Sequence, residues 1–363
     1  MLKHDPFSPN KVLEGKRILI VGGTGSLGKT LLSRIIRGEA GRPARVVVFS
    51  RDESKQHQVR LEYLRRTVAT DEVIYERAGR VLQFRIGDVR DYAAVCGALR
   101  DIDIVFSAAA MKQVPACEYC PSEAVMTNIH GAENIIRAIR DLRLSVHTVV
   151  GISTDRAVKP INVMGMTKAL QERIFSNGNL EAPETRFIIV RYGNVLASRG
   201  SVIPLFHHQI RSGGPVTVTD PEMTRFLISL DDAVNAIFDA LRDAQRAEIY
   251  VARIPSARVL DIAMALIGQQ PIKTAFVGIR PGEKMHEVLI SEEESHRTFE
   301  RGAYYVIGSS LPELNPENSN PAYLGREYSS RDVLMTLEQV RALLIKNRLM
   351  VSTSAEKEEE LIR

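Results

Sequence analysis

The most constraining feature of the sequence is a glycine-rich turn between a short apolar run and an amphipathic segment. The run Arg17–Val21 (RILIV) is typical of a buried strand, and GGTGSLG follows it directly. Glycines at this G-x-x-G-x-x-G spacing allow a tight turn and a close approach of the backbone to a pyrophosphate, while the following helix supplies unpaired N–H groups. Strand, turn and helix in this order predict a dinucleotide-binding unit. Its expected contacts are Gly22, Thr24, Gly25, Ser26, Leu27 and Gly28.

Short β-branched runs alternate with amphipathic segments over the first half of the chain. The runs lie at Arg17–Val21, Arg45–Phe49, Leu82–Ile86, Ile102–Ser107, Thr148–Ser153 and Arg186–Arg191, and helical patterns lie at Leu27–Arg37, Tyr92–Leu99 and Ala132–Leu142. This alternation predicts an α/β fold, a Rossmann-type doubly wound parallel sheet with helices on both faces.

After about Asn194 the alternation loosens, and Gly213-Gly214-Pro215 and a Pro/Asn-rich stretch at 311–321 follow. We therefore expect a Rossmann domain at 1–193 with a return of the chain near 226–256, where Ile249–Ala252 has a strand pattern. A smaller C-terminal substrate-binding lobe is expected at 194–350. Residues 351–363, rich in Ser and Glu, are expected to form a flexible tail.

Composition and charge exclude several classes of protein. The 363 residues are 44% hydrophobic and 25% charged, as in ordinary globular proteins. The apolar runs are far shorter than a membrane span, and the first residues lack the apolar core of a signal peptide, so we expect no membrane span and a cytoplasmic location. The net charge of +4 comes from dispersed Lys and Arg, which argues against a nucleic acid partner and suits anionic small molecules.

Cysteine and histidine usage predicts no metal site. Three cysteines, Cys96, Cys117 and Cys120, do not make a disulfide framework, and the C-x-x-C pair has no second pair to complete a zinc site. We expect reduced structural thiols. The histidines show no metal-binding spacing, and His207-His208 is expected on the surface or in packing, because helix neighbours point in different directions.

The end of the second strand bears on the choice of cofactor. An acidic residue at this position binds the ribose hydroxyls of NAD, whereas Ser50, Arg51 and Lys55 offer donors and charge for a 2′-phosphate. We therefore expect NADP in preference to NAD, with Asp52 as the feature that favours NAD. Asp88 and Val89, after the third strand, are expected beside the adenine, with a simple turn as the alternative.

Longer motifs extend from Gly22 to about Ile290. They include FSRDESKQ, IGDVRDY, SAAAMKQVPACEYCPSEAV, STDRAVKPINVMGMTKA, VRYGNVLASRGSVIPLF, DPEMTRFLISLDDAV and IRPGEKMHEVLI. Together with GGTGSLG, the chain resembles an extended short-chain dehydrogenase/reductase. More narrowly, it resembles the UDP-N-acetylglucosamine 4,6-dehydratases, and within them the soluble 5-inverting branch of capsule and polysaccharide biosynthesis.

The resemblance implies a reaction and a set of catalytic residues. Hydride passes from C4 of the sugar to bound NADP and returns to C6 after water is lost, giving UDP-2-acetamido-2,6-dideoxy-4-hexulose with inverted C5. By resemblance, Thr154 bonds the sugar 4-hydroxyl, Asp155 is the acid for the departing 6-hydroxyl, and Lys168 binds the nicotinamide ribose. The plainer alternatives are a helix N-cap for Asp155 and a surface lysine for Lys168.

Two residues depart from the pattern of relatives. Met164 stands where general short-chain dehydrogenases have Tyr, a change that some dehydratase branches share, so Lys168, Asp155 or a water must accept the 4-hydroxyl proton. Arg156 stands where the family has the lysine regarded as the base at C5. Because arginine is a poor general base, either Arg156 stabilises an enolate while Asp155 handles protons, or the reaction differs.

The resemblance also nominates further binding residues. For the cofactor these are Ala108, Ala109, Ala110, Lys112, Asn128, Ser153, Lys168, Tyr192, Gly193 and Asn194. For the nucleotide sugar they are Asn194, Arg199, Ser201, Val202, Arg225 and Arg280. Lys112 is added because it lies on a loop at the carboxyl end of the fourth strand, where ligands bind in open α/β sheets, and Glu283 is expected either to bind a ribose or to cap a helix. The arginines suit a diphosphate, with surface salt bridges as the alternative.

Other functions remain open at this stage. A GDP- or CDP-linked GlcNAc 4,6-dehydratase fits the same motifs, since no residue reports the nucleotide base. A nucleotide-sugar epimerase is disfavoured by Met164 and Arg51, because epimerases of this superfamily keep the Tyr-x-x-x-Lys pair and often use NAD. A catalytically silent nucleotide-binding homologue is suggested by Arg156. The resemblance further implies a homo-oligomer, with a hexamer as a candidate state.

Overall fold

The computed structural model describes residues 11–68, 81–196, 201–315 and 322–351. Within these ranges, nine strands form one sheet in the order β14-β15-β10-β6-β5-β4-β1-β2-β3. The strands are β1 (Arg17–Val21), β2 (Arg45–Ser50), β3 (Leu82–Ile86), β4 (Ile104–Ser107), β5 (Thr148–Thr154), β6 (Arg186–Tyr192), β10 (Ile249–Ala252), β14 (Thr298–Arg301) and β15 (Tyr304–Ile307). From β3 to β10 every neighbouring pair is parallel. The predicted α/β parallel-sheet fold is confirmed.

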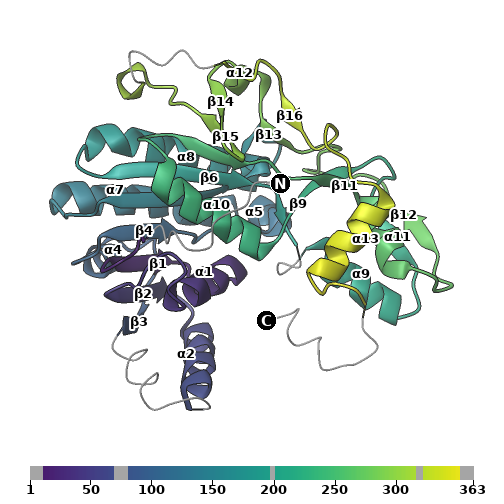
Figure 1. Cartoon of the computed structure of the whole chain (residues 1–363), viewed down its shortest axis with the longest axis horizontal. Helices are drawn as coiled ribbons and strands as arrows, with labels where there is room; N and C mark the ends of the chain where they lie inside the picture. Colours follow the sequence, from purple (N-terminus) through teal and green to yellow (C-terminus); the bar gives the residue numbers. More distant parts are fainter. Residues whose placement is uncertain (1–10, 69–80, 197–200, 316–321, 352–363) are drawn as a thin grey trace.

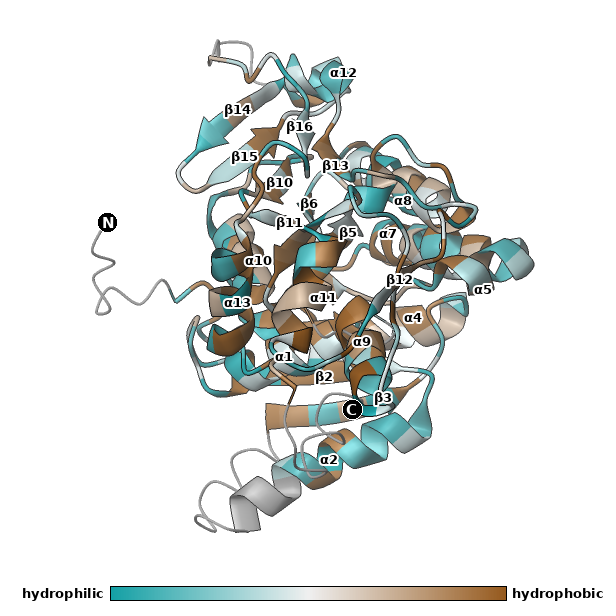
Figure 2. Cartoon of the chain, turned by 90° about the vertical axis from the view of Figure 1, so that its right-hand side faces the viewer, coloured by the Kyte–Doolittle hydropathy of each residue, from teal (hydrophilic) through white to brown (hydrophobic). Residues whose placement is uncertain are grey.

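Helices cover both faces of this sheet. The helices on the first part of the chain are α1 (Ser26–Ile36), α2 (Glu53–Val68), α4 (Tyr92–Ala98), α5 (Val114–Tyr119), α6 (Pro121–Ala124), α7 (Gly131–Asp141), α8 (Val163–Glu181) and α10 (Leu230–Asp243). Figure 2 shows α1 and α10 on one side of the sheet and α7 and α8 on the other. A π-helical turn, η1 (Val125–His130), precedes α7, and a 3-10 turn, η2 (Asp155–Ala157), follows β5. Because ligands bind at the carboxyl ends of the strands in such sheets, η2 lies in the region where a ligand is expected.

Burial explains why these residues form strands. β1, β4 and β5 are covered on both faces, and their side chains are almost all buried, as expected for central parallel strands. The edge strand β3 is largely exposed beyond Leu82. Four strand boundaries differ from the prediction: β4 begins at Ile104 rather than at residue 102, and β2, β5 and β6 each continue one residue further, to Ser50, Thr154 and Tyr192.

The later part of the chain divides between the large sheet and a second group of elements. The group comprises α9 (Val202–Arg211), α11 (Val259–Ile267), α13 (Leu337–Lys346), β7 (Asn194–Val195), β8 (Val216–Val218), β9 (Thr224–Ile228), β11 (Ser256–Arg258) and β12 (Thr274–Phe276). A separate buried cluster around Phe206, Ile262 and Leu344 holds α9, α11 and α13 together, and these helices lie side by side in Figure 1.

More strands of the later part of the chain join the large sheet than expected. β10 pairs with β6 inside the expected range, but β14 and β15 also join the sheet, although the expected boundaries put them in the substrate-binding lobe. The remaining elements are β13 (Val288–Ile290), β16 (Tyr328–Ser329), α12 (Glu292–Ser295) and the 3-10 turn η3 (Pro312–Leu314). Residues 352–363 of the expected tail lie outside the described ranges.

The structure also bears on the expectations for the cysteines, for His207 and for a membrane span. Cys96 is half-buried, Cys117 is buried and Cys120 is exposed, and all three are free thiols. His207 is buried, with Nε2 2.8 Å from the carbonyl oxygen of Leu349. Among the described helices, none combines the length and the apolar character that crossing a bilayer requires.

Candidate active site

A cavity of about 760 Å³ opens at the carboxyl ends of the parallel strands. The glycine turn lines one side of it, and the ends of β5 and β6 with the start of α8 line the other. The predicted residues that line it are Gly22, Thr24, Gly25, Ser26, Leu27, Gly28, Ser50, Arg51, Asp52, Lys55, Asp88, Val89, Ala108, Ala109, Ala110, Lys112, Ser153, Thr154, Asp155, Arg156, Met164, Lys168, Tyr192, Gly193, Asn194, Ser201, Arg280 and Glu283.

The glycine turn is shaped by close backbone packing. Gly22 has φ +82°, and a Cβ there would lie 2.6 Å from the backbone nitrogen of Ala109. A Cβ on Gly28 would lie 2.6 Å from Cα of Gly23. No side chain caps the N-terminus of α1, which begins beside the cavity. The turn can therefore admit a phosphate group close to backbone N–H groups.

The end of β2 presents a mixed set of charges. Asp52 forms a 2.5 Å ion pair with the Lys55 side chain and accepts a hydrogen bond from the Lys55 N–H. The Arg51 side chain is 61% exposed, and its Nη1 lies 3.9 Å from Asp88 Oδ2. Burial opposes ionisation of Asp88, but hydrogen bonds from Arg90 hold its pKa below the ordinary value. Arg51 is thus available to an anionic group that enters here.

Asp155 is the most deeply buried polar side chain of the cavity wall. It is 1% exposed, its Oδ1 accepts a 2.8 Å hydrogen bond from Thr154 Oγ1, and within the described residues its Oδ2 has no hydrogen-bond partner. Burial, together with the negative charge of Glu287, raises the pKa of Asp155 to about 6. A carboxyl with a raised pKa can supply a proton near neutral pH.

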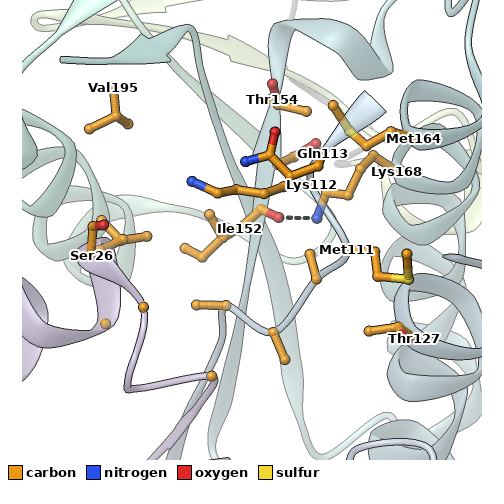
Figure 3. A pocket seen from close by; sticks show the side chains of 18 of the residues that line it. Ser26, Met111, Lys112, Gln113, Thr127, Ile152, Thr154, Met164, Lys168 and Val195 are labelled. Atoms are coloured by element: carbon orange, nitrogen blue, oxygen red, sulfur yellow. Dashed lines mark hydrogen bonds between the residues drawn. The ribbon is translucent and has the colours of Figure 1, made fainter. Parts of the chain in front are cut away.

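Lys168 lies on α8, opposite the end of β5. Its Nζ donates a 2.5 Å hydrogen bond to the carbonyl oxygen of Ile152 and another to Gln171 Oε1. Figure 3 shows the first of these bonds, with Met164 beside Lys168. Burial lowers the pKa of Lys168 to about 8, against the opposing charge of Glu172. Met164, one turn earlier, is buried against Cys117 and Ala124 and offers no hydroxyl.

A buried ion network supports this wall from behind. Ser153 Oγ donates a 2.5 Å hydrogen bond to Glu172 Oε1, and Arg191 on β6 binds both Glu172 and Glu294 over 2.6 and 2.8 Å. Arg191 is 1% exposed. The network ties β5, β6, α8 and α12 together beneath the site.

Some predicted residues lie elsewhere. Arg225 does not line the cavity: it is buried, and its Nη1 donates to the carbonyl oxygen of Thr224 over 2.8 Å, because β9 carries it away from the open face. Val202 packs against the second apolar cluster, and Asn128 supports the site by donating to Thr167 Oγ1 over 2.9 Å. Arg199 falls outside the described residues.

The sequence reasoning missed several residues of the cavity wall. They are Val21, Phe49, Met111, Gln113, Val114, Pro115, Thr127, Ile152, Val195, Leu230 and Pro281. Met111 and Gln113 flank Lys112, so the position of that loop could have identified them. Figure 3 shows Lys112 reaching across the cavity near Ile152. Thr127 carries no sequence signal, yet its Oγ1 is buried and has no hydrogen-bond partner within the described residues.

The chain is similar to a known protein family and to proteins that carry names. Residues 18–309 match the family described as polysaccharide biosynthesis protein. Proteins named UDP-glucose 4-epimerase from Rickettsia canadensis and Rickettsia bellii are 40% and 39% identical over 341 residues, which is 91% of this chain and 95% of theirs.

Solved structures show the same architecture. Pen from Bacillus thuringiensis is 36% identical with a TM-score of 0.82, over 93% of this chain and 99% of that one. DesIV from Streptomyces venezuelae, named dTDP-glucose 4,6-dehydratase and solved with NAD, is 20% identical with a TM-score of 0.62, over 74% and 86%. At that identity the second likeness concerns the fold alone.

Proposed function

The chain belongs to the family of polysaccharide biosynthesis proteins, and from that premise we propose that it is a nucleotide-sugar 4,6-dehydratase with the fold of the extended short-chain dehydrogenases/reductases. The proposed substrate is UDP-N-acetylglucosamine, and the product is its 6-deoxy-4-keto derivative with inverted C5. The observation that carries the proposal is Asp155, a buried carboxyl with a raised pKa in the same cavity as the glycine turn and Lys168.

Each residue of the wall has a role in this reaction. The glycine turn and the end of β2 would hold NADP, which would supply the hydride chemistry between C4 and C6 of the sugar. Thr154 holds the 4-hydroxyl, and Lys168 orients the ribose of the cofactor. A water takes the C5 proton, and Asp155 gives its proton to the 6-hydroxyl, which leaves as water. A proton then returns to C5 from the opposite face. The sum is the loss of one water from the substrate.

Arg156 and Met164 require a different course of proton transfer from that of a site with lysine and tyrosine at these two positions. The guanidinium of Arg156 stays charged and therefore stabilises the negative charge of the enolate at C4–C5 rather than removing the proton itself. Met164 cannot exchange a proton, so the 4-hydroxyl proton passes to Asp155, Lys168 or a water. The low pKa of Lys168, about 8, makes its neutral form accessible for that transfer.

NADP is the proposed cofactor. Asp52 is neutralised by its ion pair with Lys55, and Arg51 is exposed at the end of β2. Both features suit a 2′-phosphate better than a free ribose hydroxyl pair. The distant structures solved with NAD support a nicotinamide cofactor in this fold.

A 4-epimerase is the second candidate, favoured by the names of the Rickettsia relatives. Met164 disfavours it, because epimerases of this superfamily use a tyrosine at this position. GDP- or CDP-linked substrates and a catalytically silent binder are the remaining alternatives.

One experiment separates these candidates. The purified protein is incubated with UDP-N-acetylglucosamine in deuterated water, and the products are followed by mass spectrometry and NMR. A product lighter by one water, deuterated and inverted at C5, supports the dehydratase. An isomer of unchanged mass supports the epimerase, and unchanged substrate directs the test to GDP- and CDP-sugars. Asp155→Asn serves as the inactive variant and the exposed Asp101→Asn as its matched control.

The same proposal includes the division into a Rossmann domain and a substrate-binding lobe, and a homo-oligomeric state. The two apolar clusters support the division, because each packs around its own set of elements. Light scattering on the purified protein would determine the number of subunits.

A further inference from the structure

A group of buried charges lies behind Asp155, outside the cavity. It consists of Arg225 on β9, Lys284 in the loop before β13, and Glu287, which directly precedes β13; we call these three residues the rear charge cluster. None of them lines the cavity. Glu287 is 1% exposed, and Arg225 is also buried. The reaction steps above use none of these side chains.

The rear charge cluster is connected to the turn that carries Asp155. Lys284 Nζ donates a 2.5 Å hydrogen bond to the carbonyl oxygen of Val158, directly after η2, and lies 3.6 Å from Glu287 Oε2. Arg225 Nε lies 3.8 Å from Glu287 Oε1. The strand β13 itself packs against η2. Glu287 is therefore held against the back of the catalytic turn by both backbone packing and ion pairs.

Asp155 and Glu287 each have one buried carboxylate oxygen that accepts no hydrogen bond from the described residues. Asp155 Oδ2 and Glu287 Oε2 are buried, and neither has a hydrogen-bond partner in the described part of the chain. Two carboxyl groups in a buried site disfavour each other's ionisation, because their charges repel through a medium that screens poorly. Burial and the charge of Glu287 both raise the pKa of Asp155, while Arg156 and Arg225 oppose the rise.

We propose that Glu287 is a positioning residue for the reaction, a second buried carboxylate that acts through Asp155 and extends the pH range in which Asp155 can donate its proton. The proposal rests on the proposed dehydration, in which the 6-hydroxyl needs a proton to leave. Burial first and the charge of Glu287 second raise the pKa of Asp155 from 3.8 to about 6, and together they increase its protonated fraction at neutral pH roughly a hundredfold.

The charged groups around Asp155 and Glu287 determine in which direction the pKa of Asp155 should move in each variant. Asp155 is faced by Arg156 on its own turn, by Arg225 on β9 and by Glu287 and Lys284 from the loop before β13. The charge of Glu283 raises the pKa of Arg225, and the pKa of His286 is lowered by burial and by the charges of Arg331 and Arg225. Removing the negative charge of Glu287 must therefore lower the pKa of Asp155, and removing the positive charge of Lys284 must raise it.

The first test compares pH profiles of kcat for the wild type, Glu287→Gln and Glu287→Asp. If Asp155 acts as the acid, activity falls at high pH as its proton is lost. We expect Glu287→Gln to move this fall to lower pH by about one unit, a roughly tenfold loss at alkaline pH. Glu287→Asp keeps the charge and restores the wild-type profile. An equal loss at every pH would show a purely structural role and overturn the proposal.

The second test does not need turnover. Protein labelled with ¹³C in the Asp side-chain carboxyl is titrated by NMR, and the signal missing from Asp155→Asn is assigned to Asp155. We expect its midpoint to fall in Glu287→Gln and to rise in Lys284→Met, a variant that keeps the aliphatic stem. Lys284→Met also serves if Glu287→Gln does not fold. Unchanged midpoints would overturn the role of Glu287, whereas failure of the wild type to dehydrate UDP-N-acetylglucosamine would overturn only the proposed function.

Discussion

Gly165, in the first turn of α8, packs directly against the carbonyl group of Arg156: a Cβ on Gly165 would lie 2.3 Å from that oxygen. Pro160 closes the same space from another side, at 3.1 Å. We expect Gly165→Ala to push η2 away from α8, to cost about 1–3 kcal/mol of stability and to lower kcat at least tenfold. Urea unfolding and steady-state kinetics would measure both effects.

A matched control for this substitution is Gly97→Ala near the end of α4. There a new Cβ would meet only the end of the Arg85 side chain, at 2.1 Å, and a flexible guanidinium can move. Gly97→Ala should keep wild-type kcat. If Gly165→Ala also keeps it, the contact between α8 and η2 does not position the catalytic residues.

The charge of Arg156, rather than its basicity, is expected to matter. Arg156→Lys should retain turnover within about tenfold, because a cation remains to stabilise the enolate, whereas Arg156→Gln should lose about a hundredfold or more in kcat. Deuterium uptake at C5 in deuterated water, followed by NMR, reports on the same step. Equal activity of the wild type and Arg156→Gln would contradict this role.

Arg51 should determine the choice between the two nicotinamide cofactors. Because its side chain is exposed beside the cavity, Arg51→Ala should weaken NADP binding about tenfold or more and leave NAD binding nearly unchanged. Titration calorimetry with both cofactors measures the ratio. Arg37→Ala, which removes a similarly exposed arginine that pairs with Glu39, should change neither affinity. A parallel loss for NAD and NADP would argue against a 2′-phosphate contact.

Local sequence patterns predicted the parts of the molecule that depend on neighbours along the chain. The glycine turn and the run Ser153–Arg156 both line the cavity, because a strand end and the residues after it are necessarily close in space. The sequence was less informative about residues whose positions depend on packing between distant parts of the chain. Arg225 was expected at the ligand, yet it lies behind the site, since its partner Glu287 is brought there only by the folded chain.

The same limit applies to β14 and β15. Their short runs have ordinary strand patterns, but nothing in the pattern states which sheet they join. They extend the large sheet because β10 leaves an open edge that β15 pairs with in antiparallel fashion. Thr127 illustrates a further limit, since a single threonine inside a helical turn gives no sign that its hydroxyl faces a cavity.

The Arg191 network should contribute strongly to stability when one member is removed. Arg191→Met leaves Glu172 and Glu294 buried without their shared cation, and such losses cost about 3–5 kcal/mol. Chemical denaturation should show this loss. Arg253→Met, which removes an exposed pair with Glu300, is the control and should change stability by less than about 1 kcal/mol. Similar losses for both variants would mean that the buried network has no special role.

Asp155 should lower the stability of the folded protein at neutral pH. Its pKa is about 6 in the folded chain, above the ordinary 3.8, so between about pH 4 and pH 6 the folded state holds a proton that the unfolded state has released. The free energy of unfolding therefore falls as pH rises through that window. Above the window the ionised, buried carboxylate lowers it by about 3 kcal/mol.

Asp155→Asn removes this ionisation while keeping an oxygen that can accept from Thr154. We expect the variant to be inactive yet to melt a few degrees higher than the wild type near pH 7.5, with the difference shrinking toward zero below about pH 4. Thermal scans of both proteins across this range test the expectation, and Asp101→Asn, at an exposed aspartate, should show no such trend. A melting temperature lower than that of the wild type at every pH would mean that the carboxylate stabilises the fold, and that its raised pKa is not the source of its acidity in the reaction.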